Sequence, residues 1–455
     1  MDSEAPKISE FETKNINQLF FKYGFITLAG MLAQCVMVIL EAVVTGNGLG
    51  AVGLATISII MPLELLNDAI GTGLGIGVST IAAQYKGQGN DKAARKIWND
   101  GFWLTLIFSV ILAVIIGLFA DPVASMLGAK GEVKQMASLF IRVFMIGYPF
   151  CFVGQVGIAM LRVDEKPGLA SWITAIAAVV AIAELYWGIF IAHIGIMASA
   201  IYYGLSLGIF TLSIIPFLNK NNKYHLSFDL KFNWVDLKRA IVLSMPFILI
   251  TLSSAAYNWI MNLVLGSFGG NNDIAAFSLI NGYIFYVLNI VTTSLMQGMQ
   301  PIASDNYGAK LPNRLAQLLK ISIIVNTIVV AAITVIFALF AHSIAAVFTT
   351  SVPVINITST SGIIVVGLTA IGSNVNMLSG YYQAIGKAGV STFLGILKFL
   401  ICATPLALLF AYTLGMKAIW FAQPVSDIIS FAVVIFLLVK EMGAIKEIKI
   451  AEQGD

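Results

Sequence analysis

The chain has 455 residues, of which 58% are hydrophobic and only 11% are charged, and its mean hydropathy is +0.90. Soluble domains carry roughly a quarter charged residues, so this composition excludes a soluble protein and leaves no stretch for a separate soluble domain. The net charge of +3 is too small and too dispersed to indicate nucleic-acid binding. The three cysteines lie in apolar stretches without metal-ligand spacing, so we expect no disulfide framework, cofactor or tightly held metal.

Apolar stretches of about 20 residues or more, the length that crosses a bilayer as a helix, follow one another along almost the whole chain. They predict an all-α integral membrane protein with twelve transmembrane helices. The polar start, residues 1–19, is unlike a cleaved signal peptide, so the first span is expected to direct its own insertion. The predicted spans are 23–45, 54–84, 98–120, 136–161, 168–194, 195–218, 237–268, 273–303, 317–345, 354–384, 388–413 and 416–440.

Lys and Arg are distributed unequally between the two sides of these predicted spans. One side receives 21 of the 26, in both termini and in five connecting segments. Loops rich in Lys and Arg stay in the cytoplasm, so we expect both termini there. The connecting segments on this side are 85–97, 161–167, 219–239, 304–320 and 385–387.

An internal repeat is visible at one offset. Residues 83–87 resemble residues 304–308, which lie 221 positions later, and the same offset maps residues 166–168 onto residues 387–389. Six spans per copy return the chain to the same side, so the two copies are expected to be parallel, pseudo-symmetric six-helix bundles. We therefore divide the chain into two lobes. The N-lobe is 1–220 with spans one to six, and the C-lobe is 221–455 with spans seven to twelve, including an interlobe linker at about 219–236.

Two strings carry a resemblance to a known family. Gln297-Gly298-Met299-Gln300-Pro301-Ile302, followed by Asn306-Tyr307-Gly308-Ala309-Lys310, resembles the end of the eighth helix in the multidrug and toxic compound extrusion (MATE) family, particularly its MepA-like bacterial branch. Residues 380–387 are similar to the end of that family's tenth helix. The resemblance implies two lobes around a central cleft that opens alternately to either side of a bacterial cytoplasmic (inner) membrane. It also implies efflux of small organic, often cationic compounds by antiport against protons or sodium ions, and we expect a monomer surrounded by lipid.

The sequence departs from the family pattern at positions that matter for ion binding. The family's Asp on the first helix is Glu41 here, and its Asn-x-x-x-Asp on the fifth helix is Val180 and Glu184. A hydroxyl-bearing run on the sixth helix is replaced by residues 198–203. These changes keep the carboxylates but remove two candidate sodium ligands. We therefore expect protons as the coupling ion; if sodium were used, Glu41 and Glu184 would be its ligands.

Ionisable side chains at membrane depth are costly and are functional candidates by default. In the N-lobe these are Glu41 on the first span, Glu64 and Asp68 on the second, and Glu184 on the fifth. We expect Glu41 and Glu184 to form the ion-coupling centre. Glu64 and Asp68 share a helical face beside Asn67 and would contribute to that centre or bind cationic substrate. The alternatives are that Glu41 caps the first helix and that Glu64 and Asp68 make structural hydrogen bonds.

The C-lobe spans contain almost no acid but many amides and aromatic residues. These side chains could line the cleft and contact substrate. The commoner role of amides in membrane proteins is packing between helices. Lys398 and Asp427 are expected to form a structural ion pair rather than a proton relay. The candidate substrate-binding residues of both lobes are Asn67, Tyr257, Asn258, Asn262, Asn281, Tyr283, Gln297, Gln300 and Asn374.

Two other classes of function fit the sequence less well. A flippase for lipid-linked or other amphiphilic substrates would be expected to carry a strongly cationic cleft, whereas the N-lobe charges here are acidic. An intramembrane enzyme is disfavoured because neither H-E-x-x-H nor G-x-S-x-G occurs.

Overall fold

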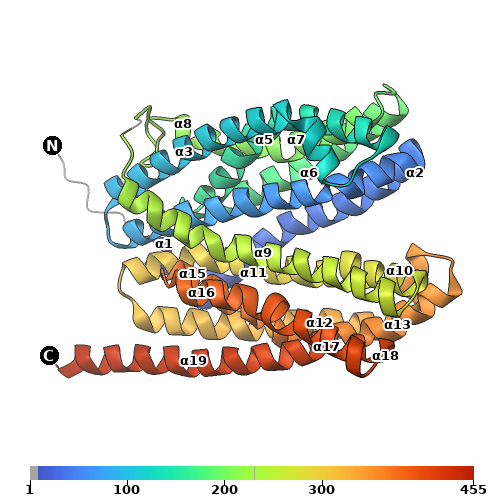
Figure 1. Ribbon diagram of the computed structural model, residues 1–455. Coiled ribbons are helices and arrows are strands. Elements are labelled where there is room, and N and C mark those ends of the chain that lie inside the picture. The colour runs from blue at the N-terminus through green and yellow to red at the C-terminus, as the bar shows by residue number, and fades with distance from the viewer. Residues whose placement is uncertain (1–8, 230, 455) are drawn as a thin grey trace. The chain divides into compact units, whose positions relative to one another are not determined.

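The computed structural model describes residues 9–229 and 231–454, which form long helices joined by short loops (Figure 1). Eleven helices in this part of the chain are long and apolar enough to cross a membrane, and a bent pair brings the number to twelve. The prediction of twelve spans is therefore confirmed, with most ends shifted by a few residues.

The first six spans come from seven helical elements. The second span follows the first in one element that contains a non-helical residue, Gly50, at the break between them. The elements are α2 (Ile16–Gly87), α3 (Asp91–Leu118), α5 (Gly131–Val163), α6 (Pro167–Phe190), α7 (Ile196–Gly208), η1 (Ile209–Ile214) and α8 (Ile215–Leu218), with short α1 (Glu10–Thr13) and α4 (Ala120–Met126) beside them.

The last six spans contain more irregular helix. The tenth is bent by 44° where α13 ends, and η2 and η3 are π-helical segments within the eighth and eleventh. The elements are α9 (Trp234–Phe268), α10 (Asn271–Leu279), η2 (Ile280–Phe285), α11 (Tyr286–Gly308), α12 (Pro312–Phe348), α13 (Val352–Val366), α14 (Thr369–Gly372), α15 (Asn374–Ala384), α16 (Ala388–Ile396), η3 (Leu397–Ala403), α17 (Thr404–Thr413), α18 (Met416–Ile419) and α19 (Ala422–Gly454).

These helices pack into two compact units. The first unit contains residues 26–244 and the segment that ends at Glu10, and the second contains residues 11–25 and the chain from Met245. The first turns of α2 thus belong to the second unit, and the first turns of α9 belong to the first unit. The segment 219–236, which the sequence analysis placed in the C-lobe, also lies in the first unit.

Glycines allow these exchanged helix starts to pack closely. A Cβ atom at Gly298 would lie 2.7 Å from the Cα atom of Gly24, and a Cβ atom at Gly77 would overlap the carbonyl oxygen of Ala240. Gly77 and Gly298 are 221 residues apart, which is the offset of the sequence repeat. The two units therefore repeat the same close crossing between helix backbones.

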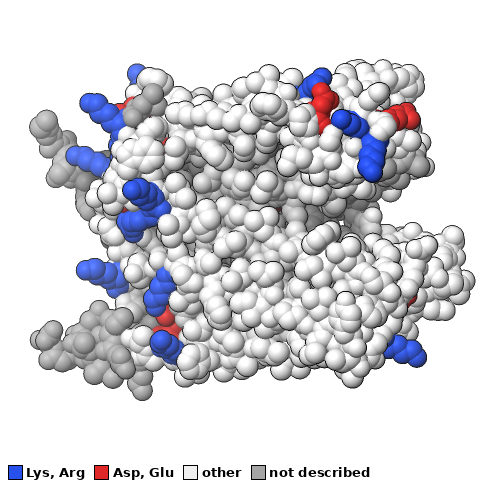
Figure 2. Space-filling model, viewed as in Figure 1, with Lys and Arg blue, Asp and Glu red and all other residues white. Residues whose placement is uncertain are grey.

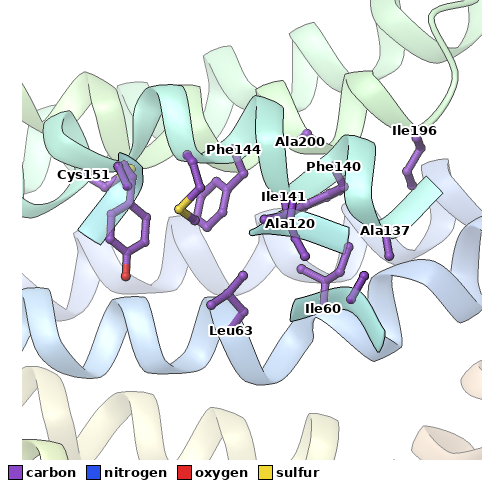
Figure 3. Close-up of a cluster of buried hydrophobic side chains, with 14 of the residues drawn as sticks. Ile60, Leu63, Ala120, Ala137, Phe140, Ile141, Phe144, Cys151, Ile196 and Ala200 are labelled. Atoms are coloured by element: carbon purple, nitrogen blue, oxygen red, sulfur yellow. The ribbon is translucent and has the colours of Figure 1, made fainter. Parts of the chain in front are cut away.

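The core of the first unit is an aromatic and aliphatic cluster between α2, α4, α5 and α7. Figure 3 shows Ile60 and Leu63 of α2 turned toward side chains of α5, among them Phe140 and Phe144. This packing fixes the rotation of α2 about its axis. It therefore also sets the direction of Glu64 and Asp68, which follow Leu63 on the same helix.

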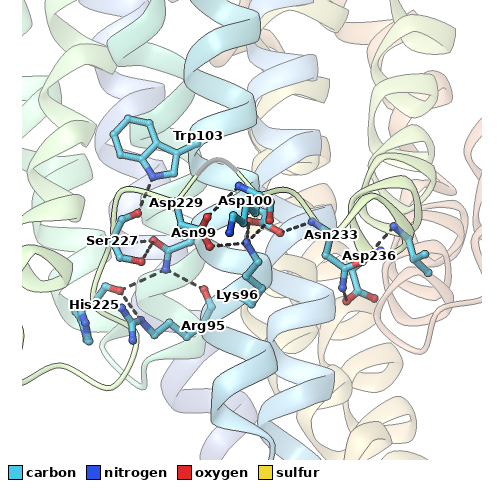
Figure 4. A network of polar contacts seen from close by, with 12 residues as sticks. Arg95, Lys96, Asn99, Asp100, Trp103, His225, Ser227, Asp229, Asn233 and Asp236 are labelled. Atoms are coloured by element: carbon cyan, nitrogen blue, oxygen red, sulfur yellow. Dashed lines mark hydrogen bonds and ion pairs between the residues drawn. The ribbon is translucent and has the colours of Figure 1, made fainter.

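The segment between the sixth and seventh spans is held on α3 by side chains that bond its backbone (Figure 4). Arg95 donates to the carbonyl oxygen of His225 at 2.9 Å, and Trp103 donates to that of Ser227 at 2.9 Å. The Asn99 side-chain oxygen accepts from the Ser227 N–H at 2.6 Å. These bonds satisfy backbone groups that a loop would otherwise leave to water.

Charged side chains complete this anchor. Lys96 binds Asp100 at 2.7 Å and Asp229 at 3.1 Å, and Asp100 accepts from the Asn233 N–H at 2.8 Å. The backbone N–H of Lys231 and the ammonium group of Lys96 hold the pKa of Asp229 below its usual value. The segment is therefore an ordered part of the first unit.

On the face shown in Figure 2, charged side chains lie at the ends of the helices and their middle stretches carry none. Arg142 pairs with Asp121 at 2.6 Å near such an end, and both side chains are 54% exposed. Large apolar side chains are exposed between the ends, for example Val114 and Ile146. An uncharged apolar band flanked by charged ends is the surface of a membrane-spanning protein.

Candidate ion and substrate site

Glu41 lies inside α2, several residues before its break, and its side chain is only 4% exposed. The hydroxyl of Tyr203 donates a hydrogen bond to Glu41 Oε2 at 2.8 Å, and Tyr202 also interacts with this carboxyl group. The other oxygen, Oε1, has no hydrogen-bond partner among the described residues. Glu41 therefore does not cap a helix end. It is a buried acid with one oxygen that accepts a hydrogen bond from Tyr203 and one oxygen that has no partner among the described residues.

Tyr203 corrects one expectation from the sequence. From the sequence, residues 198–203 are expected to lack the hydroxyl of the family pattern. The structure instead supplies a hydroxyl from a longer side chain, that of Tyr203, to the carboxyl group of Glu41. The lengthened acid and the tyrosine together make a carboxyl–hydroxyl contact.

Glu64 lies close to this pair. Its half-buried carboxyl group interacts with both Glu41 and the Tyr203 hydroxyl, and its Oε1 atom is buried without a partner among the described residues. Two acids and a phenol thus meet between α2 and α7. Two neighbouring carboxylates repel each other when both are charged, so the two acids are electrostatically coupled.

Asp68, one turn after Glu64 on α2, belongs to a chain of polar side chains that continues through Thr72 to Gln155 on α5. The hydroxyl of Thr72 lies 3.3 Å from Asp68 Oδ1 and 2.8 Å from Gln155 Oε1, and Gln155 is buried. Asp68 itself is exposed. Asn67 is fully buried, and neither atom of its amide has a partner among the described residues, so it faces the packed interior of the unit rather than the side of Asp68.

Glu184 is half-buried on α6, and its Oε2 atom has no partner among the described residues. Helices α2, α6 and α7 meet in one apolar cluster that contains Met37, Leu185 and Tyr202. The protein contacts of Glu41 are with tyrosines and Glu64. Glu184 is therefore a second acid of this unit with an unpartnered oxygen among the described residues, and its helix packs beside that of Glu41.

The candidate residues of the second unit fall into separate groups. Asn281 donates a hydrogen bond to Asn258, which joins the eighth span to the seventh. Tyr257 is buried, with ring centroids 5.6 Å from Phe399 and 6.4 Å from Phe277. Asn262, one turn further along α9, is exposed.

The remaining amides of this unit mostly connect helices. Gln300 donates to Gln383 at 2.7 Å, and Asn374 accepts from Asn326 at 3.0 Å. Gln297 is buried on α11. For Gln300 and Asn374 the observed contacts are those of helix packing, the alternative stated from the sequence. Tyr283 stacks on Phe348 with centroids 4.6 Å apart.

Sequence reasoning missed two members of the site in the first unit, Tyr203 and Gln155. Tyr203 was visible only as a departure from the family pattern, and its reach to Glu41 depends on how α7 packs against α2. Gln155 gave a weak signal, an amide within an apolar span, and Gly71 provides the space that it fills.

Comparison with known sequences identifies relatives over most of the chain. The family model MatE matches twice, at residues 26–187 and 246–412. A protein of Shewanella oneidensis described as an FAD transporter is 24% identical over 402 residues, covering 84% of this chain and 85% of that protein. The multidrug export protein MepA of Staphylococcus haemolyticus is 21% identical over 392 residues, covering 85% of each chain.

Solved structures show the same fold. A crystal structure described as MATE in complex with MaL6 has a TM-score of 0.89 at 21% identity, covering 96% of this chain and 99% of that chain. A MOP superfamily transporter from Pyrococcus furiosus also has a TM-score of 0.89, at 20% identity, covering 96% and 98%. The twelve-helix architecture is therefore that of known transporters.

Proposed function

Because the chain belongs to the MatE family of membrane transporters, we propose that it is a secondary active exporter, an antiporter that exchanges organic cations for protons by alternating access. The family and the helix count establish a multi-pass membrane transporter. The coupling ion, the charge of the substrate and the direction of transport are the proposed part.

The contact of Glu41 with Tyr203 and Glu64 carries the proposal of proton coupling. A proton needs only one carboxyl oxygen, and Glu41 Oε1 and Glu64 Oε1 are both buried without protein partners among the described residues. Sodium needs several oxygen ligands at once, and the hydroxyl nearest Glu41 is oriented as a hydrogen-bond donor to it. In this proposal Glu184, with its open oxygen on the neighbouring helix, exchanges protons together with Glu41.

The acidic and aromatic side chains support a cationic substrate. Asp68 is exposed and Glu64 is half-buried, so a positive group could approach both. Aromatic rings and amides bind the apolar and polar parts of organic cations. The proposed substrate contacts in the second unit are those of Tyr257, Asn258, Asn262, Asn281, Tyr283 and Gln297. Gln300 and Asn374 bind other helices, and Asn67 faces the packed interior of the first unit, so these three are not among the proposed contacts.

Transport into proteoliposomes tests the proposal. With a pH gradient or a sodium gradient imposed alone, we expect ethidium uptake to follow the pH gradient. Glu41→Gln and Glu184→Gln should abolish it without lowering the yield of folded protein. Glu132→Gln is the matched control, because Glu132 is an exposed acid in the first turn of α5. Normal uptake by Glu41→Gln, or uptake that follows only the sodium gradient, would refute proton coupling at this site.

The charge of the substrate is tested in the same vesicles. FAD is included as a counter-substrate, because one relative is described as an FAD transporter. Uptake of FAD without uptake of ethidium would contradict the proposed substrate class while leaving the transporter assignment intact.

We also propose that the protein resides in a bacterial cytoplasmic membrane with both termini in the cytoplasm, as the Lys and Arg distribution indicates. The three native cysteines are buried, so single cysteines introduced at Lys92 and Lys130 can be labelled with little background. In intact cells, an impermeant thiol reagent should label the cysteine at position 130 and not that at position 92. The reverse result would contradict this orientation.

A further inference from the structure

Lys398 and Asp427 form an ion pair inside the second unit. Lys398 Nζ lies 2.8 Å from Asp427 Oδ1, and the two side chains are 3% and 0% exposed, which confirms the pairing expected from the sequence. The ammonium group also lies over two aromatic rings, 5.3 Å from the centroid of Phe285 and 5.5 Å from that of Phe399. A carboxylate with aromatic faces around it is the arrangement that binds alkylammonium groups.

A purely structural pair would be expected to have all its polar atoms satisfied, because burying charges is otherwise costly. This pair does not meet that expectation. Asp427 Oδ2 is buried without a hydrogen-bond partner among the described residues. Gln423 reaches only the other oxygen, Oδ1, at 3.4 Å. The carboxylate therefore retains an unused acceptor within a closed environment.

The helices around the pair are irregular where they meet it. Lys398 lies in the π-helical segment η3, and Phe285 is the last residue of the π-helical segment η2. Gly372 follows the 44° bend of the tenth span, and a Cβ atom there would overlap the carboxylate of Asp427. Single π-helical turns within α-helices are rare and occur frequently at functional sites.

A small cavity of about 10 Å³ adjoins Lys398, enough for about one water molecule. The hydroxyl of Thr369 in its wall is buried without a partner among the described residues. The polar residues lining this cavity, besides Lys398, are Asn289, Thr292, Thr369, Ser373 and Asn376.

Two residues that line the cavity correspond, in the internal repeat, to polar residues of the site in the first unit. The offset of 221 residues pairs Asn289 with Asp68 and Asn376 with Gln155. Both partners in the first unit belong to the polar chain that leads away from Glu64. At these two positions the second unit therefore carries two amides where the first unit carries one acid and one amide, while Asp427 provides an acid from another helix.

We propose that Asp427, with the ring faces of Phe285 and Phe399, forms a binding site for an alkylammonium group, and that Lys398 occupies this site as an internal ligand in the present conformation. A cationic group of the exported compound takes the place of the lysine ammonium when Lys398 moves away. This exchange with substrate rests on the proposed export of organic cations; the existence of the site does not.

Chemical rescue tests the site directly. Lys398→Ala removes three carbon atoms and the ammonium group, which together correspond to propylammonium, and leaves Asp427 unpaired. In the full chain purified in detergent, we expect this variant to unfold several degrees below the unsubstituted protein and to recover most of the loss with propylammonium. Sodium at equal ionic strength should not restore it, and neither ion should stabilise Lys398→Ala/Asp427→Asn.

The contrary outcomes are equally specific. Absence of rescue by propylammonium, or equal rescue by sodium or in the double variant, would overturn the alkylammonium site. If Lys398→Ala cannot be purified alone, the yield of monodisperse protein with propylammonium present during extraction becomes the measurement, and no increase over sodium counts against the site.

Equilibrium binding of ethidium tests the exchange with substrate. Asp427→Asn keeps the shape of the side chain and should weaken ethidium binding several-fold, and propylammonium should compete with ethidium in Lys398→Ala. Unchanged affinity in Asp427→Asn, or no ethidium binding by the unsubstituted protein, would overturn the exchange. Neither assay uses an ion gradient, so its failure is distinguishable from failure of coupling at Glu41.

Discussion

Gly298 offers a quantitative test of the close crossing between α11 and the start of α2. An alanine Cβ atom at this position would lie 2.7 Å from both the Cα and N atoms of Gly24 and 2.8 Å from the carbonyl carbon of Tyr23. These are backbone atoms, so they cannot rotate away, and the helices would have to separate by more than half an ångström to reach ordinary contact. Overpacking of this kind costs about 1–3 kcal/mol, and the gain in helix propensity offsets only about 1 kcal/mol of it.

A matched series separates the crossing from the effect of glycine itself. At the same crossing, a Cβ atom at Gly24 would lie 3.0 Å from the flexible end of Leu295, so Gly24→Ala should cost less than Gly298→Ala. Gly168 and Gly389 have nothing within 4 Å of an added Cβ atom, and alanine there should leave stability equal or slightly higher. The assay is the midpoint of unfolding in detergent and in sodium dodecyl sulfate. If Gly298→Ala were as stable as Gly389→Ala, the packing at this crossing would have been misjudged.

Three further outcomes follow from contacts described above or from the same structure. Lys86→Met should lower the free energy of unfolding by about 1.5–3 kcal/mol, because buried Lys86 donates to Glu165 at 2.6 Å and to the Val163 carbonyl at 2.9 Å. Arg142→Ala should cost less than about 1 kcal/mol, because its pair with Asp121 is exposed. Unfolding midpoints compare the two variants, and equal losses would contradict the larger contribution of the buried pair. Asn99→Ala should speed cleavage by trypsin at Lys223 and Lys231, since it frees the Ser227 backbone, and an unchanged digestion rate would show that the remaining bonds suffice. Tyr203→Phe should alter the pH dependence of ethidium uptake while leaving the yield of folded protein unchanged, because it removes the hydrogen bond to Glu41; a profile identical to that of the unsubstituted protein would exclude this role.

The spans could be predicted because lipid imposes a length and a composition on each of them. The fifth and sixth, which are almost continuous in hydropathy, were separated correctly near Gly195, where the backbone has a φ of 64°. The exchange of helix starts between the units could not be predicted. A hydropathic segment is apolar whether it faces lipid or packs against protein. Hydropathy therefore does not indicate which of the two units a given turn of helix packs against.

The site was predictable in its acids and less so in their partners. Cost at membrane depth singles out Glu41 and Glu64 without any structure. Their contact with Tyr203 depends on the rotation of α2 and α7, which apolar spans specify weakly because most faces are apolar. The roles of the amides in the second unit could not be predicted. A residue such as Gln300 or Asn374 gives the same sequence signal whether it binds substrate or another helix.

The exchanged helix starts also have a consequence for biosynthesis. Residues 11–25 are made early, yet Leu295 and Gly298, which pack against Gly24, are made about 270 residues later. The first unit likewise remains incomplete until the chain has passed through its ordered linker to Ser244. The first half therefore cannot finish folding as soon as its own six helices have entered the membrane, whereas the second half packs onto residues 11–25, which were made before it. Ribosome-bound chains that end near residue 220 should therefore be protease-sensitive, and chains that extend beyond residue 244 should protect the first unit.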